Sequence, residues 1–231
     1  MKTDNSMYKS LNNQFGAISL QQRLSLLERM YPNLVIASSF GLSTLVIIDM
    51  YYRRLKLRIP VIFLDTLYHF DETLATAERV CEKYSLDFRR YTPREAETRE
   101  EFESLYGPNL WERDLQRFHE LTKLRQMHEA LADHDAWISG LRWDQSPERW
   151  GAAILHWDDK FGLYKLNPLA DWTMDQVFEY IQTHEIPYNP LHDQGYLSIG
   201  DEPLTDPVGP FESMRAGRWR GLAKTECGLH V

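Results

Sequence analysis

The amino-acid sequence predicts an α/β protein with a mainly parallel sheet flanked by helices. Two short apolar runs, Leu34–Ala37 and Val61–Leu64, have the length of buried strands, and each ends in a polar turn. Segments with apolar residues at helical spacing separate such runs, and this alternation is typical of βαβ units. Hydrophobic residues make up 43% of the 231 residues, which is enough for a substantial core.

Two capping-box pairs mark helix starts. Ser19 with Gln22, and Thr173 with Gln176, each place a hydroxyl at the N-cap and a Gln three residues later. The second of these helices is expected to run to about residue 184. The other predicted elements are helices that begin after the turn at residues 38–41 and near residue 71, and strands at residues 86–91 and 136–140.

Two segments depart from this alternation. Residues 94–131 are acidic with helical spacing, and we interpret them as a solvated helical insertion. From about Pro187 onward, Pro, Gly, Asp and aromatic residues crowd together without periodicity, which predicts a long loop of the kind that is usually functional. We therefore expect an α/β domain over residues 1–200 and a mobile C-terminal tail over residues 201–231.

The composition excludes several classes of protein. The net charge of −8 argues against non-specific binding to nucleic acid or to an anionic membrane. No apolar stretch approaches 18 residues, and the first residues lack the apolar core of a secretory signal. Two cysteines are too few for a disulfide framework or an all-cysteine metal cluster. These features predict a cytoplasmic protein that binds no metal.

Two predicted strands end in residues suited to a nucleotide. Ser38-Ser39-Phe40-Gly41 joins a strand to a helix, and backbone N–H groups at a helix N-terminus favour a phosphate. Ordinary helix capping explains the same residues equally well. Leu64-Asp65-Thr66 ends the next strand with a carboxylate and a hydroxyl. The sequence has neither the GxxxxGK[ST] nor the GxGxxG phosphate loop, and no HExxH zinc motif.

The C-terminal residues reverse the sign of the overall charge. Four basic residues in 215–231 accompany a single Glu and Cys227; they are Arg215, Arg218, Arg220 and Lys224. Nearby cations stabilise a thiolate and attract an anionic ligand, so Cys227 is the candidate nucleophile. A solvated basic tail with an incidental Cys is the alternative. Cys81 lies in the apolar stripe of a predicted helix and is interpreted as a core residue.

These residues belong to a series of ordered motifs. They are SSFG (38–41), LDT (64–66) with Phe70 and Glu72-Thr73, YG…LWE (106–112), GLRxxQS (140–146), YK…P (164–168), PLHDQGYLSIGD (190–201), RAGRW (215–219) and ECGLH (226–230). From about Val35 to His230 the chain resembles the sulfonucleotide reductases, specifically the cluster-free phosphoadenylyl-sulfate (PAPS) reductases. That family has the adenine nucleotide alpha hydrolase-like fold with a PP-loop, and the terminal ECGLH is the most specific of the motifs.

The resemblance implies a role for residues at each motif. Cys227 would be the catalytic residue, and the residues that would bind substrate are Ser38, Ser39, Gly41, Ser43, Leu64, Asp65, Thr66, Lys123, Gly140, Arg142, Arg149, Lys165, Arg215, Arg218 and His230. Two positions depart from the family pattern, because Leu67 stands where a Gly commonly follows LDT and Trp143 replaces a usual second Arg.

The resemblance also implies the reaction and its partners. Residues 119–122 and 198–204 carry no Cys where cluster-containing relatives have their ligands, so no iron–sulfur cluster is expected. Cys227 would reduce 3′-phosphoadenylyl sulfate through an S-sulfocysteine, and external thioredoxin or glutaredoxin would release sulfite, because no redox domain follows Cys227. The alternatives are a cluster-free adenylyl-sulfate (APS) reductase, a PP-loop ATPase or adenylyltransferase, and a nucleotide-binding module with a redox-sensing Cys. Assembly into a homodimer is left open.

Overall fold

The structure, a computed structural model, describes residues 5–222, 224, 226, 228 and 229, so Cys227 and His230 lie outside the described residues. The helices are α1 (Asn5–Gly16), α2 (Leu20–Met30), α3 (Leu42–Asp49), α4 (Asp71–Tyr84), α5 (Arg99–Tyr106), α6 (Leu110–Arg113), α7 (Leu115–His119), α8 (Arg125–Leu131) and α9 (Met174–Thr183). The strands are β1 (Leu34–Ala37), β2 (Val61–Leu64), β3 (Phe88–Tyr91), β4 (Ala136–Ile138), β5 (Leu155–Asp158) and β6 (Leu163–Leu166). Short π-helical turns continue α3 over Met50–Leu55 and precede α8 over Glu120–Leu124.

The strands form one six-stranded sheet in the order β3-β2-β1-β4-β6-β5. All neighbouring pairs are parallel except β5 with β6. The chain moves outward from β1 to β2 and β3, and then returns to place β4 on the other side of β1. The direction of strand succession therefore reverses between β1 and β4, and ligands of open α/β sheets bind at such a point.

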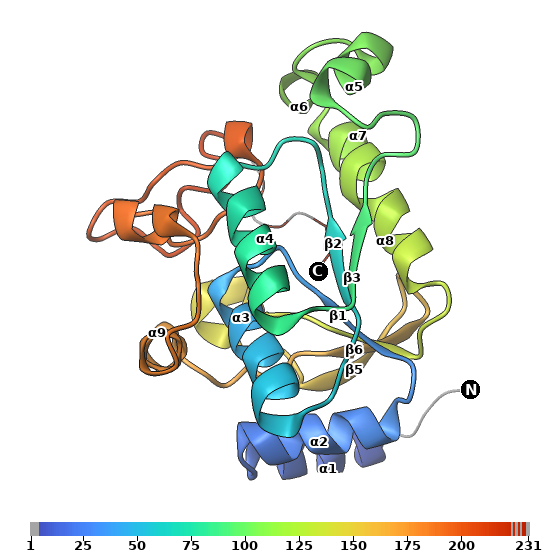
Figure 1. The fold of residues 1–231 in the computed structure, drawn as a ribbon, viewed down its shortest axis with the longest axis vertical. Helices are drawn as coiled ribbons and strands as arrows, with labels where there is room; N and C mark the ends of the chain where they lie inside the picture. The colour runs from blue at the N-terminus through green and yellow to red at the C-terminus, as the bar shows by residue number, and fades with distance from the viewer. Residues whose placement is uncertain (1–4, 223, 225, 227, 230–231) are drawn as a thin grey trace.

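Helices cover both faces of the sheet (Figure 1). Successive side chains of a strand point to opposite faces, so Ile36 packs in the core with α3, α4 and α9, whereas Val35 packs with Met127 and Leu131 of α8. Strands buried on both faces read as continuous apolar runs, which explains why β1 and β2 were visible in the sequence. The predicted fold class is confirmed.

Most predicted elements occur at the predicted residues. Both capping boxes form, at Ser19 and Thr173, and the predicted strand at 86–91 is shorter, since it begins at Phe88. Helix α1 and strands β5 and β6 were missed. Strand β6 contains Lys165, which is 2% exposed and lies 4.7 Å from the centre of the Trp137 ring, so a buried charge interrupts the apolar run that would have revealed this strand.

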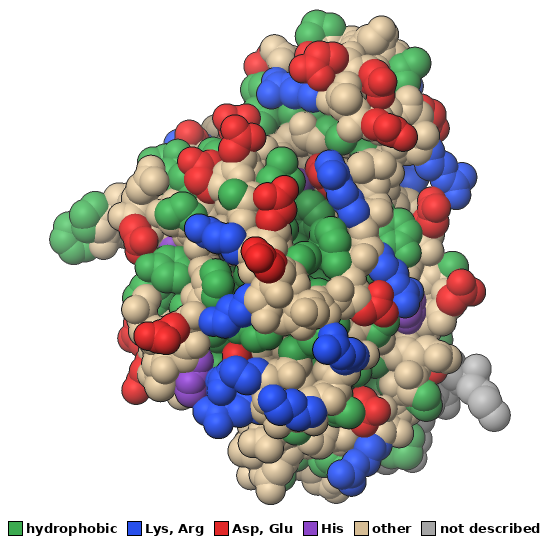
Figure 2. All heavy atoms as spheres, in the orientation of Figure 1, with side chains coloured by type: hydrophobic (Ala, Val, Ile, Leu, Met, Phe, Trp, Pro, Cys, Tyr) green, Lys and Arg blue, Asp and Glu red, His purple; other side chains and the backbone are tan. Residues whose placement is uncertain are grey.

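The segment 94–131 is a crossover between β3 and β4, and its interpretation as a solvated insertion is wrong in part. Its acidic residues do face solvent, and Figure 2 shows them gathered over the end of the molecule that α5 and α6 form. However, Phe102, Phe118 and Thr122 are fully buried, and α8 packs on the sheet. The segment therefore has a core of its own and also supplies one layer of the domain.

No helix among the described residues has the length and apolar character needed to cross a membrane.

A buried arginine joins the N-terminal helices to the loop after β6. Arg23 is 2% exposed, and its guanidinium donates to the carbonyl of Phe15 at 3.0 Å and to that of Pro168 at 2.5 Å. It also forms a two-point ion pair with Asp171, at 2.7 and 2.8 Å. All of these acceptors lose their donor together if Arg23 is removed.

We expect Arg23→Ala to lower the free energy of unfolding by about 3 kcal/mol, because it leaves partly buried acceptors without a donor. Urea unfolding measures this loss. The matched control is Arg29→Ala in the exposed part of the same helix, which should change stability by less than about 0.5 kcal/mol. Equal losses for the two variants would contradict the assignment.

Candidate active site

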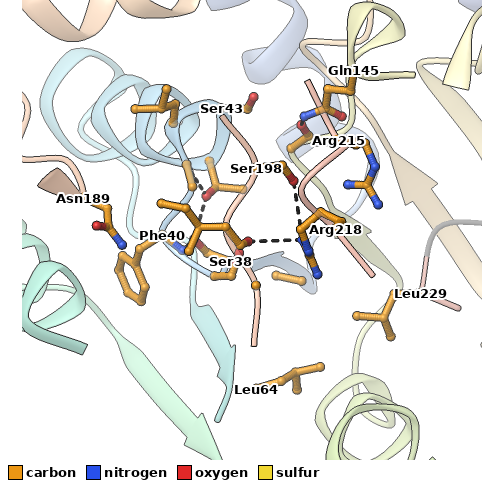
Figure 3. Close-up of a pocket in the computed structure, with 18 of the residues that line it drawn as sticks. Ser38, Phe40, Ser43, Leu64, Gln145, Asn189, Ser198, Arg215, Arg218 and Leu229 are labelled. Carbon is orange, nitrogen blue, oxygen red and sulfur yellow. Dashed lines mark hydrogen bonds between the residues drawn. The ribbon is translucent and has the colours of Figure 1, made fainter. Parts of the chain in front are cut away.

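A cavity of about 230 Å³ lies at the carboxyl ends of the parallel strands. Its wall combines the turn after β1, Leu64 and Thr66 at the end of β2, and Gly140 after β4. Two C-terminal stretches complete it, residues 197–201 and the residues Met214, Arg215, Arg218 and Trp219. In Figure 3, Phe40 and Asn189 approach from one side, and Arg215 and Arg218 approach from the other. The cavity thus occupies the point where the strand order reverses, as expected for a ligand site.

The turn between β1 and α3 presents its backbone to the cavity. The Ser38 hydroxyl accepts the Phe40 N–H at 2.9 Å and is hydrogen-bonded to the Thr44 hydroxyl at 2.7 Å. Phe40 takes a left-handed conformation (φ 56°), and Gly41 caps α3 without any side-chain hydrogen bond. Since the Ser38 hydroxyl holds the turn, an anion here would meet mainly the helix N-terminus.

Gly140 allows the end of β4 to approach this turn closely. A Cβ at Gly140 would lie 2.9 Å from Cγ2 of Thr44, nearer than side chains pack. The approach lets Arg142 donate to the Ser43 hydroxyl at 2.5 Å and to Asp144 at 2.9 Å. Arg142 is 1% exposed; burial lowers the pKa of its guanidinium, although the nearby Asp144 carboxylate partly opposes this shift.

A buried ion pair forms the floor of the site. The ammonium of Lys123 contacts a carboxylate oxygen of Asp201 at 2.5 Å, and the other oxygen accepts the Thr66 hydroxyl at 2.8 Å. Asp201 is fully buried. Burial alone would raise the pKa of its carboxyl, but Lys123, His69 and Thr66 lower it well below its usual range. Asp201 is therefore a fixed anion that holds Lys123 at the cavity.

His119 lies behind this pair and is held neutral. Burial, with a further contribution from the charge of Lys123, lowers the pKa of His119 to about 3. Its Nδ1 is 2.9 Å from the ammonium of Lys224 and accepts a hydrogen bond from it, so Nε2 carries the proton. Nε2 lies 4.0 Å from Asp201. The C-terminal segment is thus attached to the crossover segment through a neutral imidazole.

Two arginines of the C-terminal segment stack on one buried tryptophan. The guanidinium carbons of Arg218 and Arg215 lie 4.5 and 5.4 Å from the centre of the Trp219 ring. The Arg218 guanidinium occupies the space that a Cβ at Gly200 would fill, and it donates to the Ile199 carbonyl at 3.3 Å. Figure 3 shows this hydrogen bond beside the one to Ser198.

Glu226 brings a carboxylate to the arginines of the cavity. It forms a two-point ion pair with Arg149, at 2.6 and 2.7 Å, and accepts a further bond from Arg215 at 3.1 Å. Glu226 is 9% exposed, so the described end of the tail is packed against the site.

Most of the predicted substrate-binding residues line this cavity. They are Ser38, Ser39, Gly41, Ser43, Leu64, Thr66, Lys123, Gly140, Arg142, Arg149, Arg215 and Arg218. Asp65 and Lys165 are buried but do not line it. Asp65 instead accepts the Leu67 N–H at 2.8 Å and pairs with Arg90 at 2.5 Å, while Lys165 donates to the Leu229 carbonyl at 3.2 Å.

The two departures from the family pattern behave differently. Leu67 adopts a left-handed conformation (φ 67°), which is the conformation that a Gly would take without strain. Trp143 lies away from the cavity, and its ring N–H donates to the Ala152 carbonyl at 2.8 Å. The side chain at position 143 therefore leaves the cavity's own set of cations unchanged.

Sequence reasoning missed several residues of the cavity. They are Thr44, His69, Gln145, Asn189, His192 and Asp201. The signal was present, since His192 and Asp201 lie in the motif at 190–201 and Gln145 in the one at 140–146. Neither ring nitrogen of His192 is hydrogen-bonded to another described residue, and burial lowers the pKa of this imidazole.

Comparison with known proteins identifies the class. The profile of the phosphoadenosine phosphosulfate reductase domain family matches residues 33–207. An adenosine 5′-phosphosulfate reductase of Bacillus velezensis is 46% identical over 198 residues, which cover 85% of this chain and 84% of that protein. A phosphoadenosine phosphosulfate reductase of Emericella nidulans is 42% identical over 229 residues, which cover 95% of this chain and 74% of the relative.

A solved structure has the same fold. The phosphoadenylyl-sulfate reductase of Candida auris, determined as a phosphate complex, superposes with a TM-score of 0.82 at 31% identity and covers 90% of this chain and 99% of its own. The fold and the site thus define an α/β protein with a cavity, lined by basic side chains, at the point where the strand order reverses. The chain belongs to the phosphoadenosine phosphosulfate reductase family, the sulfonucleotide reductases of the PP-loop superfamily, and is an oxidoreductase of that family.

We expect the free energy of unfolding to fall between pH 7.5 and pH 5.0. A histidine whose pKa is lowered by folding binds a proton in the unfolded chain first, so its contribution is present above about pH 6.5 and is lost as the pH falls. For His119, with its pKa of about 3, the loss by pH 5.0 is about 2 kcal/mol. Urea unfolding at both pH values measures the difference.

The variant that tests this is His119→Asn, whose amide oxygen can still accept from Lys224. It should show a smaller loss of stability than the unchanged protein over the same pH range. The exposed His128, replaced by Asn in the same way, is the matched control and should leave the loss unchanged. An undiminished loss in His119→Asn would refute the role of this imidazole.

Proposed function

We propose that this protein reduces 3′-phosphoadenylyl sulfate to sulfite and adenosine 3′,5′-bisphosphate with an external dithiol. The observation that carries the proposal is the concentration of basic side chains at the cavity of a sulfonucleotide reductase fold. They are Lys123, Arg142, Arg149, Arg215 and Arg218. A nucleotide with a sulfate, a 5′-phosphate and a 3′-phosphate is strongly anionic, so it needs cations around it, and arginines recognise such groups in a bidentate manner.

Cys227 is the proposed nucleophile. Its thiolate attacks the sulfonate sulfur, a sulfur–sulfur bond forms, and the bond from that sulfur to the bridging oxygen breaks. The electron pair of this bond leaves with the phosphate of adenosine 3′,5′-bisphosphate, and the enzyme carries an S-sulfocysteine. The basic side chains would hold the sulfate and phosphate oxygens, whose charge would otherwise repel the thiolate.

A dithiol protein, thioredoxin or glutaredoxin, completes the cycle. One of its thiolates attacks the sulfur of Cys227 and sulfite leaves, and its second thiol then breaks the mixed disulfide and regenerates Cys227. The dithiol is oxidised by two electrons and the sulfonate sulfur is reduced to sulfite. One Cys on this chain is sufficient for the scheme.

We propose that the reaction needs no iron–sulfur cluster, and that the protein acts in the cytoplasm. The whole chain contains two cysteines, whereas such a cluster is held by four thiolates. Cys81 packs against the core, and burial raises the pKa of its thiol, so it is suited neither to ligating a cluster nor to acting as the nucleophile.

Adenylyl sulfate is the second candidate substrate, and two observations favour it. The Bacillus velezensis relative is named an adenosine 5′-phosphosulfate reductase. In addition, Arg142 and Arg149, two of the predicted substrate-binding residues that we propose as contacts of a 3′-phosphate, are paired with Asp144 and Glu226. A 3′-phosphate would have to compete with these carboxylates.

We expect Cys227→Ser to bind adenosine 3′,5′-bisphosphate and to form no sulfite, because an alcohol at this position does not supply the thiolate. Cys81→Ala is the matched control and should remain active. Intact-mass analysis after substrate is added without a dithiol should show one sulfonate adduct, on the peptide that contains Cys227. Sulfite formation by Cys227→Ser would exclude this mechanism.

We expect kcat/KM to be higher for 3′-phosphoadenylyl sulfate than for adenylyl sulfate by about a hundredfold, because charge-assisted hydrogen bonds contribute about 1.5–3 kcal/mol each. Sulfite release with reduced thioredoxin, measured for both nucleotides, tests this ratio. Equal or reversed efficiencies would assign the protein to the adenylyl-sulfate reductases instead.

A further inference from the structure

Glu226 occupies an anion position between two arginines of the cavity. The exposed fractions of the side chains of Arg149, Arg215 and Glu226 are 4%, 12% and 8%, so water screens these contacts little. Arg149 presents Nε and one Nη to the carboxylate, and its other Nη donates to Gln145 at 2.5 Å. The Nε and Nη groups of Arg149 that could donate together to a phosphate or sulfate therefore already donate to Glu226.

Arg149 and Arg215 both line the cavity, so a bound nucleotide would face the same two guanidinium groups. Pulling Glu226 away without a replacement would leave buried positive charges uncompensated, which is strongly unfavourable. Exchange for another anion avoids that cost, since phosphate and sulfate oxygens accept the same N–H groups. The carboxylate and a ligand anion are thus alternatives at one site.

We propose that Glu226 is an internal counter-anion that the phosphate or sulfate groups of the nucleotide must displace from Arg149 and Arg215, so that it limits how tightly the cavity binds anions. The inference rests on the proposed function for the identity of the ligand. The free energy that the ligand gains by contacting the two arginines is reduced by the free energy of the Glu226 contacts that it breaks. The competition weakens the binding of every anion that contacts the two arginines, free phosphate included, and a nucleotide that carries several anionic groups offsets this loss with its other contacts.

The chain supplies a matched control in the same segment. Glu212 forms a two-point ion pair with Arg220, at 2.9 Å for each contact, and this pair is exposed (38% for Glu212 and 45% for Arg220). Neither residue lines the cavity. Glu212→Gln and Glu226→Gln therefore remove the same charge from the same kind of pair, at two distances from the ligand.

The experiment is calorimetric titration of the full chain at fixed ionic strength, with inorganic phosphate and, separately, with adenosine 3′,5′-bisphosphate. We expect E226Q to bind each ligand about tenfold more tightly than the unchanged protein, and E212Q to bind within about twofold of it. E226D retains the charge on a shorter side chain and should bind phosphate much as the unchanged protein does.

Unchanged or weaker binding by E226Q would overturn the proposal and would mean that Glu226 only holds the arginines in position. A similar change in E226D and E226Q would also overturn it, because packing rather than charge would then be responsible. These titrations need no turnover. If the unchanged protein reduces neither sulfonucleotide, the proposed function fails while the competition between anions is still measured.

Discussion

The buried contact between Lys123 and Asp201 joins the three parts of the chain that form the site. Lys123 belongs to the crossover segment, Asp201 to the C-terminal segment, and Thr66, which donates to the same carboxylate, ends strand β2. A carboxylate that is fully buried is tolerated only with a partner and with its remaining oxygen hydrogen-bonded. This requirement fixes the C-terminal segment against the sheet, and with it the arginines that face the cavity.

The same constraint recurs around the cavity. Arg142 is paired with Asp144, Arg149 and Arg215 are paired with Glu226, and Lys123 is paired with Asp201. Positive charge is concentrated at the cavity, and each of these cations has a carboxylate partner in the described structure. The affinity for a ligand is then a difference between two sets of ion pairs. Changes to the carboxylates should therefore affect binding as much as changes to the cations do.

Family membership defines the class of reaction and leaves the nucleotide undetermined. Relatives of similar identity are named for either substrate. The phosphate complex of the Candida auris enzyme shows that a relative with this fold accepts a phosphate. In the present chain, Arg149 and Arg215 at the cavity already hold the carboxylate of Glu226, so under the proposed function a nucleotide anion would compete with it.

The sequence alone determined the fold class, the strands β1 and β2, both capping boxes and most of the residues around the cavity. The fold class, the two strands and the capping boxes follow from local rules, because a strand buried on both faces must be apolar and a helix N-terminus needs a capping group. The cavity residues follow instead from the resemblance of the motifs to the sulfonucleotide reductases. Only the tertiary structure decided which charged side chains form ion pairs with one another. Asp201 and Lys123 are 78 positions apart and Glu226 and Arg149 are 77 apart, and neither separation carries a periodic signal. The tertiary structure also corrected the interpretation of residues 94–131. Whether an acidic helical segment has an apolar core depends on the surface against which it packs.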